Sequence, residues 1–393
     1  MNGTIYMPVG EVCSSISDTY REKKNMVTLI NTSDVLEGRV LNHERVPNSN
    51  LKGQFKKTFQ RDDILYSEIR PQNRRFAYVD FSPIDYIAST KLMVIRAKKD
   101  VVSPKYLYYF LKNSSTVAEL QLLAETRSGT FPQITFSEVA NLTIPVPSLA
   151  VQEVIVQTMQ CLEDKITCNE QINDNLEQQA QSYFQELFVD NASPEWTTGT
   201  ISDLGTVVGG STPSKAKPEY YTESGIAWIT PKDLSINKSK FVSHGENDIT
   251  ELGLKNSSAA IMPEGTVLFS SRAPIGYIAI AAGEVTTNQG FKSVVPKPEI
   301  GTPFVYFFLK NTLPVIEGMA SGSTFKEVSG STMKNVPAVI PDAETLAKFS
   351  DFCAPIFAQQ RILEEQNQSL ATLRDNLLPK LMSGEIDVSA VQL

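Results

Sequence analysis

The side chains that could carry acid–base or metal chemistry are few and scattered in this sequence. It contains two histidines, His43 and His244, which lie in different halves of the chain in predicted loops. Two isolated histidines cannot form a histidine-rich metal site, and neither accompanies the nucleophile elbow that would complete a Ser-His-Asp triad. The four cysteines form no C-x-x-C pair, so the sequence indicates neither a zinc site nor a disulfide framework. We therefore expect no catalytic residue and no metal site in this chain.

Sequence motifs for nucleotide binding and methyl transfer are also missing. There is no G-x-x-x-x-G-K-[ST] and no G-x-G-x-x-G, and the segment GGSTPSK (209–215) lacks the spacing of a phosphate-binding loop. The Asn-Pro-Pro-aromatic motif of amino-methyltransferases does not occur, and no Glu-x-Lys follows Pro341-Asp342 as it would in a nuclease. The sequence therefore favours a protein that recognises a partner. An enzyme with an unrecognised site, such as a lone nuclease, is the alternative.

Clusters of basic, amide and hydroxyl side chains are the strongest functional candidates. Arginine and lysine bind phosphates or guanine edges, asparagine and glutamine pair with adenine, and serine and threonine help to position a duplex. In the first half of the chain the candidate DNA contacts are Lys23, Lys24, Lys56, Lys57, Arg70, Arg74, Arg75, Ser128 and Thr130. In the second half they are Ser211, Thr212, Ser214, Lys215, Lys217, Ser270, Ser271, Arg272, Thr287, Asn288, Gln289, Ser323 and Thr324. The alternative for each cluster is a solvated basic face or a structural turn.

An internal repeat relates the two halves. YLYYFLKN (106–113) returns as FVYFFLKN (304–311), and FPQITFSEVANLTIPVP (131–147) aligns without gaps with FKEVSGSTMKNVPAVIP (325–341). Upstream, ILYSEIRP (64–71) resembles VLFSSRAP (267–274), and LINTSDV (29–35) resembles WITPKDL (228–234). A period of about 195 residues is too long for a solenoid and predicts a duplicated domain. In both copies we expect the phenylalanine of the glycine-containing loop, Phe131 or Phe325, to anchor that loop in the core.

Within each copy the sequence changes from strand-like to helical. Short apolar runs between turn formers predict an α+β body over 1–147 and another over 191–341, and a heptad pattern predicts helical regions over 148–190 and 342–393. We predict that the two helices pair as a coiled coil, with Asn173 and Asn367 fixing the register and Pro355 kinking or restarting the second helix. The alternative is that each helix packs only on its own body. The predicted seam residues are Ile155, Leu162, Ile166, Leu176, Ile356, Leu363, Leu370 and Leu377.

Charge and hydropathy limit the cellular locations and partners that the sequence suggests. The net charge is −8, but the acidity is concentrated: residues 147–196 hold nine acidic side chains and one lysine, whereas residues 1–146 carry a modest basic excess. No run of eighteen apolar residues occurs, which argues against a membrane span, and the N-terminal segment lacks the features of a signal peptide. Together with the scattered cysteines, this predicts a cytoplasmic protein with no membrane partner.

A duplicated body approximates a two-fold dimer, and DNA has a local two-fold axis of its own. Two copies that have diverged can read two different sequences. The chain resembles the DNA-specificity subunits of type I restriction-modification systems. The segments that carry the resemblance are GTVLFSSRAPIGYIAIA (265–281), TTNQGFKSVVP (286–296), YFFLKN (306–311), SGSTFKEVSGSTMKNVPAVIP (321–341) and QRILEEQNQSLATLRDNLLPKLMSGEIDV (360–388).

This resemblance implies a specific architecture and set of partners. Each α+β body would be a target recognition domain that reads one half of a bipartite, asymmetric site on double-stranded DNA, and the helices would form an antiparallel coiled coil that sets the gap. Two methyltransferase subunits would bring S-adenosylmethionine and methylate adenine, and two restriction subunits would bring ATP and Mg. This chain itself would need no cofactor. The alternatives are a methylation-only or phage-exclusion system, or a coiled-coil scaffold without a DNA role.

Overall fold

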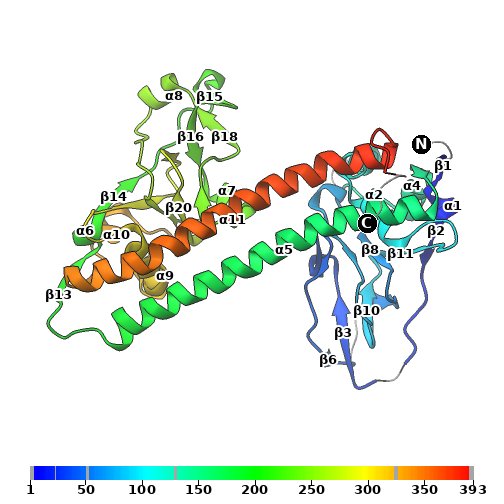
Figure 1. Cartoon of the computed structure of the whole chain (residues 1–393), viewed down its shortest axis with the longest axis horizontal. Helices are drawn as coiled ribbons and strands as arrows, with labels where there is room; N and C mark the ends of the chain where they lie inside the picture. The colour runs from blue at the N-terminus through cyan, green and yellow to red at the C-terminus, as the bar shows by residue number, and fades with distance from the viewer. Residues whose placement is uncertain (1–3, 23, 50–52, 128–130, 323–325, 389–393) are drawn as a thin grey trace. The chain divides into compact units, whose positions relative to one another are not determined.

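The computed structural model describes residues 4–22, 24–49, 53–127, 131–322 and 326–388. The chain folds into two compact units. Unit 1 comprises residues 1–166 and 369–393, and unit 2 comprises residues 167–368. Each unit combines one α+β body with a segment of each of two long helices, α5 (Leu149–Gln185) and α11 (Ala343–Ser383) (Figure 1). Among the described residues, no helix has the length and apolarity needed to cross a bilayer.

The body of unit 1 contains two four-stranded sheets, in the orders β2-β11-β8-β9 and β6-β3-β10-β7, and the strand pairs β1-β12 and β4-β5. Its strands are β1 (Ile5–Pro8), β2 (Cys13–Ile16), β3 (Met26–Ile30), β4 (Val35–Leu36), β5 (Arg39–Val40), β6 (Val46–Pro47), β7 (Phe55–Lys57), β8 (Ile64–Ser67), β9 (Phe76–Tyr78), β10 (Tyr86–Ser89), β11 (Leu92–Ala97) and β12 (Thr143–Val146). Its helices are α1 (Val9–Val12), α2 (Pro104–Lys112), α3 (Ser114–Arg127) and α4 (Phe136–Asn141).

The body of unit 2 has the same plan. Its sheets have the orders β14-β22-β19-β20-β17 and β15-β18-β16-β21, with the pair β13-β23. Its strands are β13 (Thr197–Thr200), β14 (Gly205–Gly209), β15 (Tyr221–Thr222), β16 (Ile226–Ile229), β17 (Phe241–Val242), β18 (Asn247–Ile249), β19 (Val267–Ser271), β20 (Ile275–Ala281), β21 (Thr286–Thr287), β22 (Lys292–Pro296) and β23 (Pro337–Ile340). Its helices are α6 (Ile201–Leu204), α7 (Pro231–Ile236), α8 (Glu251–Lys255), α9 (Thr302–Met319) and α10 (Gly330–Lys334).

The central strands are buried on both faces because they separate two cores. Successive side chains of a strand point to opposite faces of the sheet. In β8, Ile64 and Tyr66 join the core beneath the helices, whereas Leu65 joins the core beneath the second sheet. In β19 the same alternation sends Val267 and Phe269 to the helical side and Leu268 to the other. This explains why the runs ILYS and VLFSS are apolar or small throughout instead of alternating.

Backbone hydrogen bonds confirm the register of the repeat. The amide of Ile134 donates to the carbonyl of Glu68 at 2.9 Å, and the amide of Val328 donates to the carbonyl of Ser271 at 2.9 Å. Both LINTSDV and WITPKDL place a capping box after a parallel-paired strand, formed by residues 31–34 in one and 230–233 in the other. The gapless alignment of 131–147 with 325–341 is therefore reproduced where both segments are described.

The repeated octapeptide lies in α2 and α9 and has the same task in both units. In unit 1, Lys112 forms an ion pair with Glu163 of α5, and the Tyr109 hydroxyl donates to that carboxylate at 2.9 Å. In unit 2, Lys310 and the Tyr306 hydroxyl bind another glutamate of α5 at 2.5 and 3.1 Å. The octapeptide therefore recurs because each body uses its aromatic face and its lysine to dock on α5.

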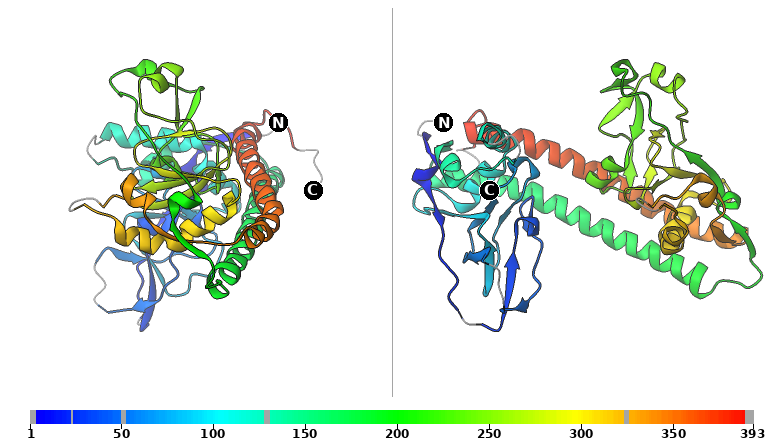
Figure 2. Two further views of the ribbon diagram at one scale, coloured as in Figure 1. Left: turned by 90° about the vertical axis from the view of Figure 1, so that its left-hand side faces the viewer. Right: turned by 180° about the vertical axis from the view of Figure 1, so that it is seen from behind.

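The two long helices pair in antiparallel orientation in both units. In unit 1, Ile155 and Met159 share a core with Leu378 and Leu381, and in unit 2 the α5 residues 176–184 share a core with the α11 residues 346–357. Residue numbers therefore increase along α5 in the direction in which they decrease along α11. Figure 2 shows the two helices from two further sides. The predicted coiled coil is confirmed, and packing of each helix on its own body alone is excluded.

The predicted seam residues of this coiled coil lie at or near its interface. The buried ones are Ile155, Ile356 and Leu363, and the half-buried ones are Leu162, Ile166, Leu176, Leu370 and Leu377. The predicted restart of the second helix at Pro355 is wrong, because α11 continues through this residue. A proline costs one hydrogen bond of the helix, and here the buried neighbours Cys353, Ile356 and Phe357 hold the backbone in place.

Two polar layers interrupt the apolar seam. Asn169 is fully buried, and its side-chain amide donates to Oδ1 of Asn367 at 2.8 Å. Asn173 contacts Gln360 instead, whose Nε2 donates to the backbone carbonyl of Asn173 at 3.1 Å. Both asparagines predicted from the heptad pattern therefore lie in the seam, but they belong to different layers. A buried amide pair of this kind is satisfied in only one register.

We expect Asn169→Leu to lower the free energy of unfolding by about 1–3 kcal/mol, because Asn367 then loses its buried partner. The double variant Asn169→Leu/Asn367→Leu should regain most of this loss, since an apolar pair of similar volume leaves no unpaired amide. Urea denaturation measures both, with Asn175→Leu on the exposed face of α5 as the control. A double variant that is less stable than the single variant would contradict the role of the pair.

Gly38 lies directly against Tyr108 of α2. Its φ is +105°, and a Cβ at this position would lie 2.2 Å from the Tyr108 hydroxyl. We expect Gly38→Ala to lower the free energy of unfolding of unit 1 by about 2 kcal/mol or more, through backbone strain and steric overlap. The control is Gly283→Ala, where a Cβ would meet open space. Equal thermal stability of the two variants would show that the contact is easily relaxed.

Candidate nucleic-acid interface

Three loops and a helix N-terminus converge on one side of the body of unit 2. The loop after β14 bonds to the end of β21 through the Ser211 amide and the Thr287 carbonyl, at 2.8 Å. The loop after β21 bonds to β16 through the Asn288 amide and the Ile229 carbonyl, at 3.0 Å. The end of β19 bonds to the same loop through the Ser271 amide and the Gly290 carbonyl, at 2.7 Å. These backbone bonds fix the loops to the sheet.

Gly210 shows how tightly the loops are joined. A Cβ at this position would lie 2.0 Å from the carbonyl oxygen of Asn288, so a residue with a side chain cannot occupy it without moving the backbone. The indole of Trp228 closes the base of the site and donates to the carbonyl of Ser211 at 3.0 Å. The turn after β19 also contains a left-handed alanine, Ala273, with φ +50°. Such backbone strain in a residue other than glycine is typical of functional sites.

Between the loops lies a hollow of about 500 Å³. We call it the unit 2 hollow, and its lining residues are Thr212, Lys215, Trp228, Thr230, Pro231, Lys232, Glu246, Asn247, Arg272, Ala273, Asn288, Gln289 and Gly290. Five of the predicted DNA contacts therefore meet in one place, although they come from three separate segments of the sequence. Trp228, Lys232, Glu246 and Asn247 also line the hollow and were not predicted from the sequence.

Several hydrogen-bond donors line the hollow. Asn288 Oδ1 accepts the backbone amide of Gly290 at 2.8 Å, which leaves the NH₂ group of Asn288 for other partners. The hydroxyl of Thr212 bonds to Oε1 of Gln289 and fixes that amide in the same way. Glu327 lies 3.4 Å from Nη1 of Arg272, a long contact that tethers the guanidinium weakly. Amide and guanidinium donors held at the ends of loops suit base edges and phosphate oxygens.

Three of the predicted contacts in unit 2 have another role. Ser270, Ser271 and Thr287 are buried. The Ser270 hydroxyl donates to the Pro274 carbonyl at 2.9 Å, and the Ser271 hydroxyl donates to the Gly290 carbonyl at 3.1 Å. Because they are buried, we reassign the three residues from DNA contact to structural roles. Ser270 and Ser271 hold the turn that carries Arg272, and the Thr287 carbonyl accepts the Ser211 amide of the loop after β14.

The remaining candidates of unit 2 lie beside the hollow. Ser211 is half-buried, and its carbonyl serves the indole of Trp228. Ser214 and Lys217 are exposed, and Nζ of Lys217 lies 5.2 Å from the ring centroid of Tyr220. They flank Lys215 on the same loop, so they remain predicted DNA contacts.

The basic candidates of unit 1 divide into exposed and engaged side chains. Lys24, Lys56 and Arg70 are exposed and remain predicted contacts. Nζ of Lys57 donates to the carbonyls of Thr90 and Leu92 at 3.1 and 2.8 Å, and burial lowers the pKa of this lysine. We therefore reassign Lys57 to a structural role that ties β7 to the loop before β11.

Two arginines of unit 1 also bond to the chain. Nη1 of Arg75 donates to the Ser33 carbonyl at 3.0 Å, and Nη2 of Arg74 donates to the Ser114 hydroxyl at 2.8 Å. Both side chains are half-buried. These bonds hold the segment after β8. A guanidinium group carries five N–H donors, so the two arginines remain predicted DNA contacts.

The glycine-containing loops are described only in part. The predicted contacts Lys23, Ser128, Thr130, Ser323 and Thr324, and the anchor Phe325, lie outside the described residues. The prediction that Phe131 anchors its loop in the core is wrong, because this side chain is 47% exposed. Ile134, three residues later, is fully buried and takes that place.

Comparison with known proteins places the chain in a family. The family model described as Type I restriction modification DNA specificity domain matches the chain twice, over residues 6–178 and 194–373. The chain is 29% identical to the type I restriction enzyme HindI specificity subunit of Haemophilus influenzae, over 92% of this chain and 94% of that one. It is 39% identical to the MjaIX specificity subunit of Methanocaldococcus jannaschii, over 47% of this chain and 45% of that one.

A solved structure shares the fold. The crystal structure of the type I restriction-modification system S subunit from M. genitalium matches 97% of this chain and 96% of its own, with a TM-score of 0.55 and 17% sequence identity. At this identity the match supports the fold alone, and the family assignment rests on the two matched domains and the full-length relative. The chain belongs to the type I restriction-modification DNA specificity family and carries the family's domain twice.

Proposed function

We propose that this chain reads a bipartite, asymmetric DNA site, one half with each α+β body. As a type I specificity subunit it is the DNA-recognition component of its system. The observation that carries the proposal is a difference between the two bodies at equivalent positions. Because the Glu68 and Ser271 amides bond to Lys91 and Gly290 respectively, residues 89–91 correspond to 288–290. Unit 1 has Thr90 and the exposed Lys91, after a buried Ser89, where unit 2 has Asn-Gln-Gly, so the two bodies should read different half-sites.

The chemistry of the system would belong to partner subunits. Two adenine methyltransferase subunits would bring S-adenosylmethionine, and two restriction subunits would bring ATP and Mg to translocate and cut the DNA. The two-fold repeat supports two copies of each, because it offers two similar docking positions. The acidic helical regions support docking of protein in preference to phosphate. A complex of this kind works on DNA in the cytoplasm, as in phage defence.

The test is methylome sequencing of cells that express this chain together with its neighbouring methyltransferase. Cells that express the methyltransferase without this chain are the control. The expected result is a new split motif, with two short specific blocks around a fixed gap and a methylated adenine in each. An active methyltransferase in a stable complex that yields no new motif would overturn the proposal and favour a scaffold.

A domain exchange tests the division of labour. Residues 1–147 are replaced by the corresponding body of another specificity subunit, which leaves the helices and unit 2 in place. We expect one half of the motif to change and the other half to persist. A change of both halves would show that the bodies do not read independently.

A further inference from the structure

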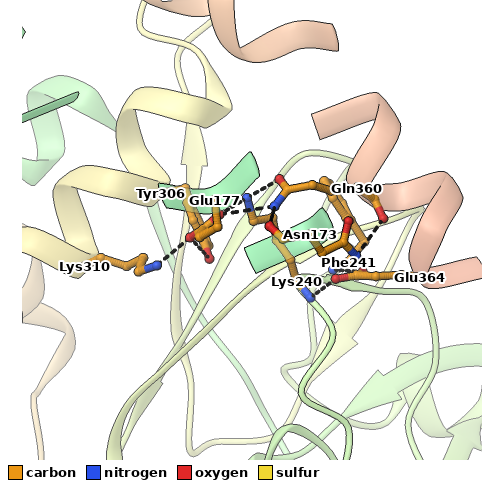
Figure 3. Close-up of polar contacts among 8 residues, drawn as sticks. All are labelled: Asn173, Glu177, Lys240, Phe241, Tyr306, Lys310, Gln360 and Glu364. Atoms are coloured by element: carbon orange, nitrogen blue, oxygen red, sulfur yellow. Dashed lines mark hydrogen bonds and ion pairs between the residues drawn. The ribbon is translucent and has the colours of Figure 1, made fainter. Parts of the chain in front are cut away.

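Lys240 is a buried lysine with no role in the hollow. It lies just before β17, and 6% of its side chain is exposed. Its Nζ forms an ion pair with Glu177 of α5 and bonds to Oε1 of Gln360 of α11 at 2.6 Å (Figure 3). It also lies 4.0 Å from the ring centroid of Phe357. One lysine of the α+β body therefore inserts between the two long helices within unit 2 and binds both.

The Glu364 carboxylate binds the backbone of the same loop. Its Oε1 accepts the amide of Lys240 at 2.7 Å, and its Oε2 accepts the amide of Phe241 at 3.0 Å (Figure 3). A carboxylate that accepts two adjacent backbone amides fixes both the position and the direction of the chain there. Lys240 and Glu364 together form what we call the unit 2 anchor.

The anchor is connected to the hollow through the sheet. β17 pairs in parallel with β20, and the Ile280 amide donates to the carbonyl of Lys240 at 2.7 Å. β20 begins directly after the turn that carries Arg272 and Ala273. Because paired strands move as a unit, a displacement of the anchor would carry the sheet and the hollow along together and leave the arrangement within the hollow unchanged.

In unit 1 the position equivalent to Lys240 is occupied by an uncharged residue, Gly38. The Tyr78 amide donates to the carbonyl of Gly38 at 3.1 Å, as the Ile280 amide does to Lys240, so the two residues are equivalent. The side chain of Tyr108, the counterpart of Tyr306, approaches Gly38 and leaves no room for a Cβ. The anchor is thus a feature of unit 2, at a position where unit 1 has glycine.

The ion pair with Glu177 favours the charged form of Lys240. Burial lowers the pKa of Lys240, and the neighbouring Glu177 carboxylate opposes that shift. Glu177 is also bound by Lys310 and by the Tyr306 hydroxyl, so it keeps partners when the Lys240 charge is removed. A methionine at position 240 can occupy the same apolar surroundings, which makes Lys240→Met a variant that should fold.

We propose that Lys240 and Glu364 are positioning residues that hold the second target recognition domain in one orientation on the helix pair, and that they thereby restrict the gap at which its half-site is read. This inference rests on the proposed bipartite reading. A body held in one orientation accepts one gap length, whereas a body that can rock on its helices accepts neighbouring lengths as well. The residues act on spacing and leave the identity of the bases read to the hollow.

The test is methylome sequencing of the complete complex with Lys240→Met, with Lys255→Met as the matched control. Lys255 is an exposed lysine of unit 2 that pairs with Glu251 on the same helix. We expect both half-site sequences to persist in Lys240→Met. Methylation at sites whose gap differs by one base pair should rise roughly tenfold, because the loss of one charge-assisted hydrogen bond changes an equilibrium by about that factor. Glu364→Gln, nearly identical in shape, should give the same broadening and serves if Lys240→Met fails to fold.

The outcomes separate this inference from the proposed function. A wild-type complex without a split motif refutes the bipartite proposal and the anchor with it. A split motif whose gap is unchanged in both variants refutes the anchor alone. An altered second half-site at an unchanged gap also refutes it, because Lys240 would then act on base reading. Broadening in Lys255→Met as well would make the effect a general consequence of lost charge and would overturn the assignment.

Discussion

Replacing Glu177 with glutamine is expected to lower the free energy of unfolding of unit 2 by about 3–5 kcal/mol. This carboxylate is the common acceptor for Lys240, Lys310 and the Tyr306 hydroxyl. Removing one partner of a buried ion pair leaves an uncompensated charge in a low-dielectric surrounding, which costs that much. Here two lysines would lose their counter-ion at once, and Lys240 is almost fully buried.

The pH dependence gives the same prediction an independent check. Burial alone would raise the pKa of Glu177, but Lys240 and Lys310 outweigh it and hold this pKa below the ordinary value of 4.5. A carboxyl whose pKa is depressed on folding stabilises the protein above its unfolded pKa and loses that contribution as the pH falls through the folded value. The stability difference between the wild type and Glu177→Gln should therefore be full at neutral pH and shrink progressively below about pH 4.5.

Amide hydrogen exchange in the full-length chain measures the effect where it occurs. We expect faster exchange in α9 and in the unit 2 segments of the long helices, with little change in unit 1. The control is Glu251→Gln, which breaks an exposed pair with Lys255 and should cost less than about 1 kcal/mol. Equal exchange rates of the α9 amides in the two variants would mean that the ion pairs of Glu177 do not stabilise unit 2. That result would also weaken the case for the anchor.

The sequence was most informative where one local pattern determines the structure. The apolar runs of β8 and β19, the matching segments LINTSDV and WITPKDL and the heptad stripes each depend on near neighbours. These patterns occur twice, and the repeat added a constraint on register that a single copy lacks. The α+β bodies, their order and the helix pair could all be predicted in this way.

The same sequence was least informative about individual polar side chains. Ser271 and Arg272 are adjacent, yet one hydroxyl is buried against the Gly290 carbonyl and the other side chain lines the hollow. Lys240 looked like any lysine of a polar loop, because its partner Glu177 is distant in the sequence and on another element. Whether a polar group faces water or the interior depends on such long-range partners, which composition and spacing do not reveal.

The second large effect is expected at Arg272, in the unit 2 hollow. Arg272→Ala should weaken binding of the assembled complex to its own site by roughly tenfold to a hundredfold, the range for loss of a bidentate arginine–base contact. Arg272 is the one cation in the hollow that sits on the strained turn after β19, and its long contact with Glu327 leaves the guanidinium free to reorient. The measurement is competition binding with oligonucleotides that carry the site identified by methylome sequencing.

Comparison with Lys215→Ala then assigns the kind of contact. Lys215 is exposed and lines the hollow, and a lysine that binds phosphate contributes equally to every sequence. Its loss should therefore weaken binding to every sequence alike and lower the slope of affinity against salt concentration by the amount of about one phosphate contact. If Arg272 reads a base, Arg272→Ala should instead tolerate substitutions at one position of the second half-site and leave discrimination in the first half-site unchanged. Uniform weakening by both variants would make Arg272 a phosphate contact and shift base reading to the amides of Asn288 and Gln289. Unchanged binding in both would remove the hollow from the DNA interface altogether.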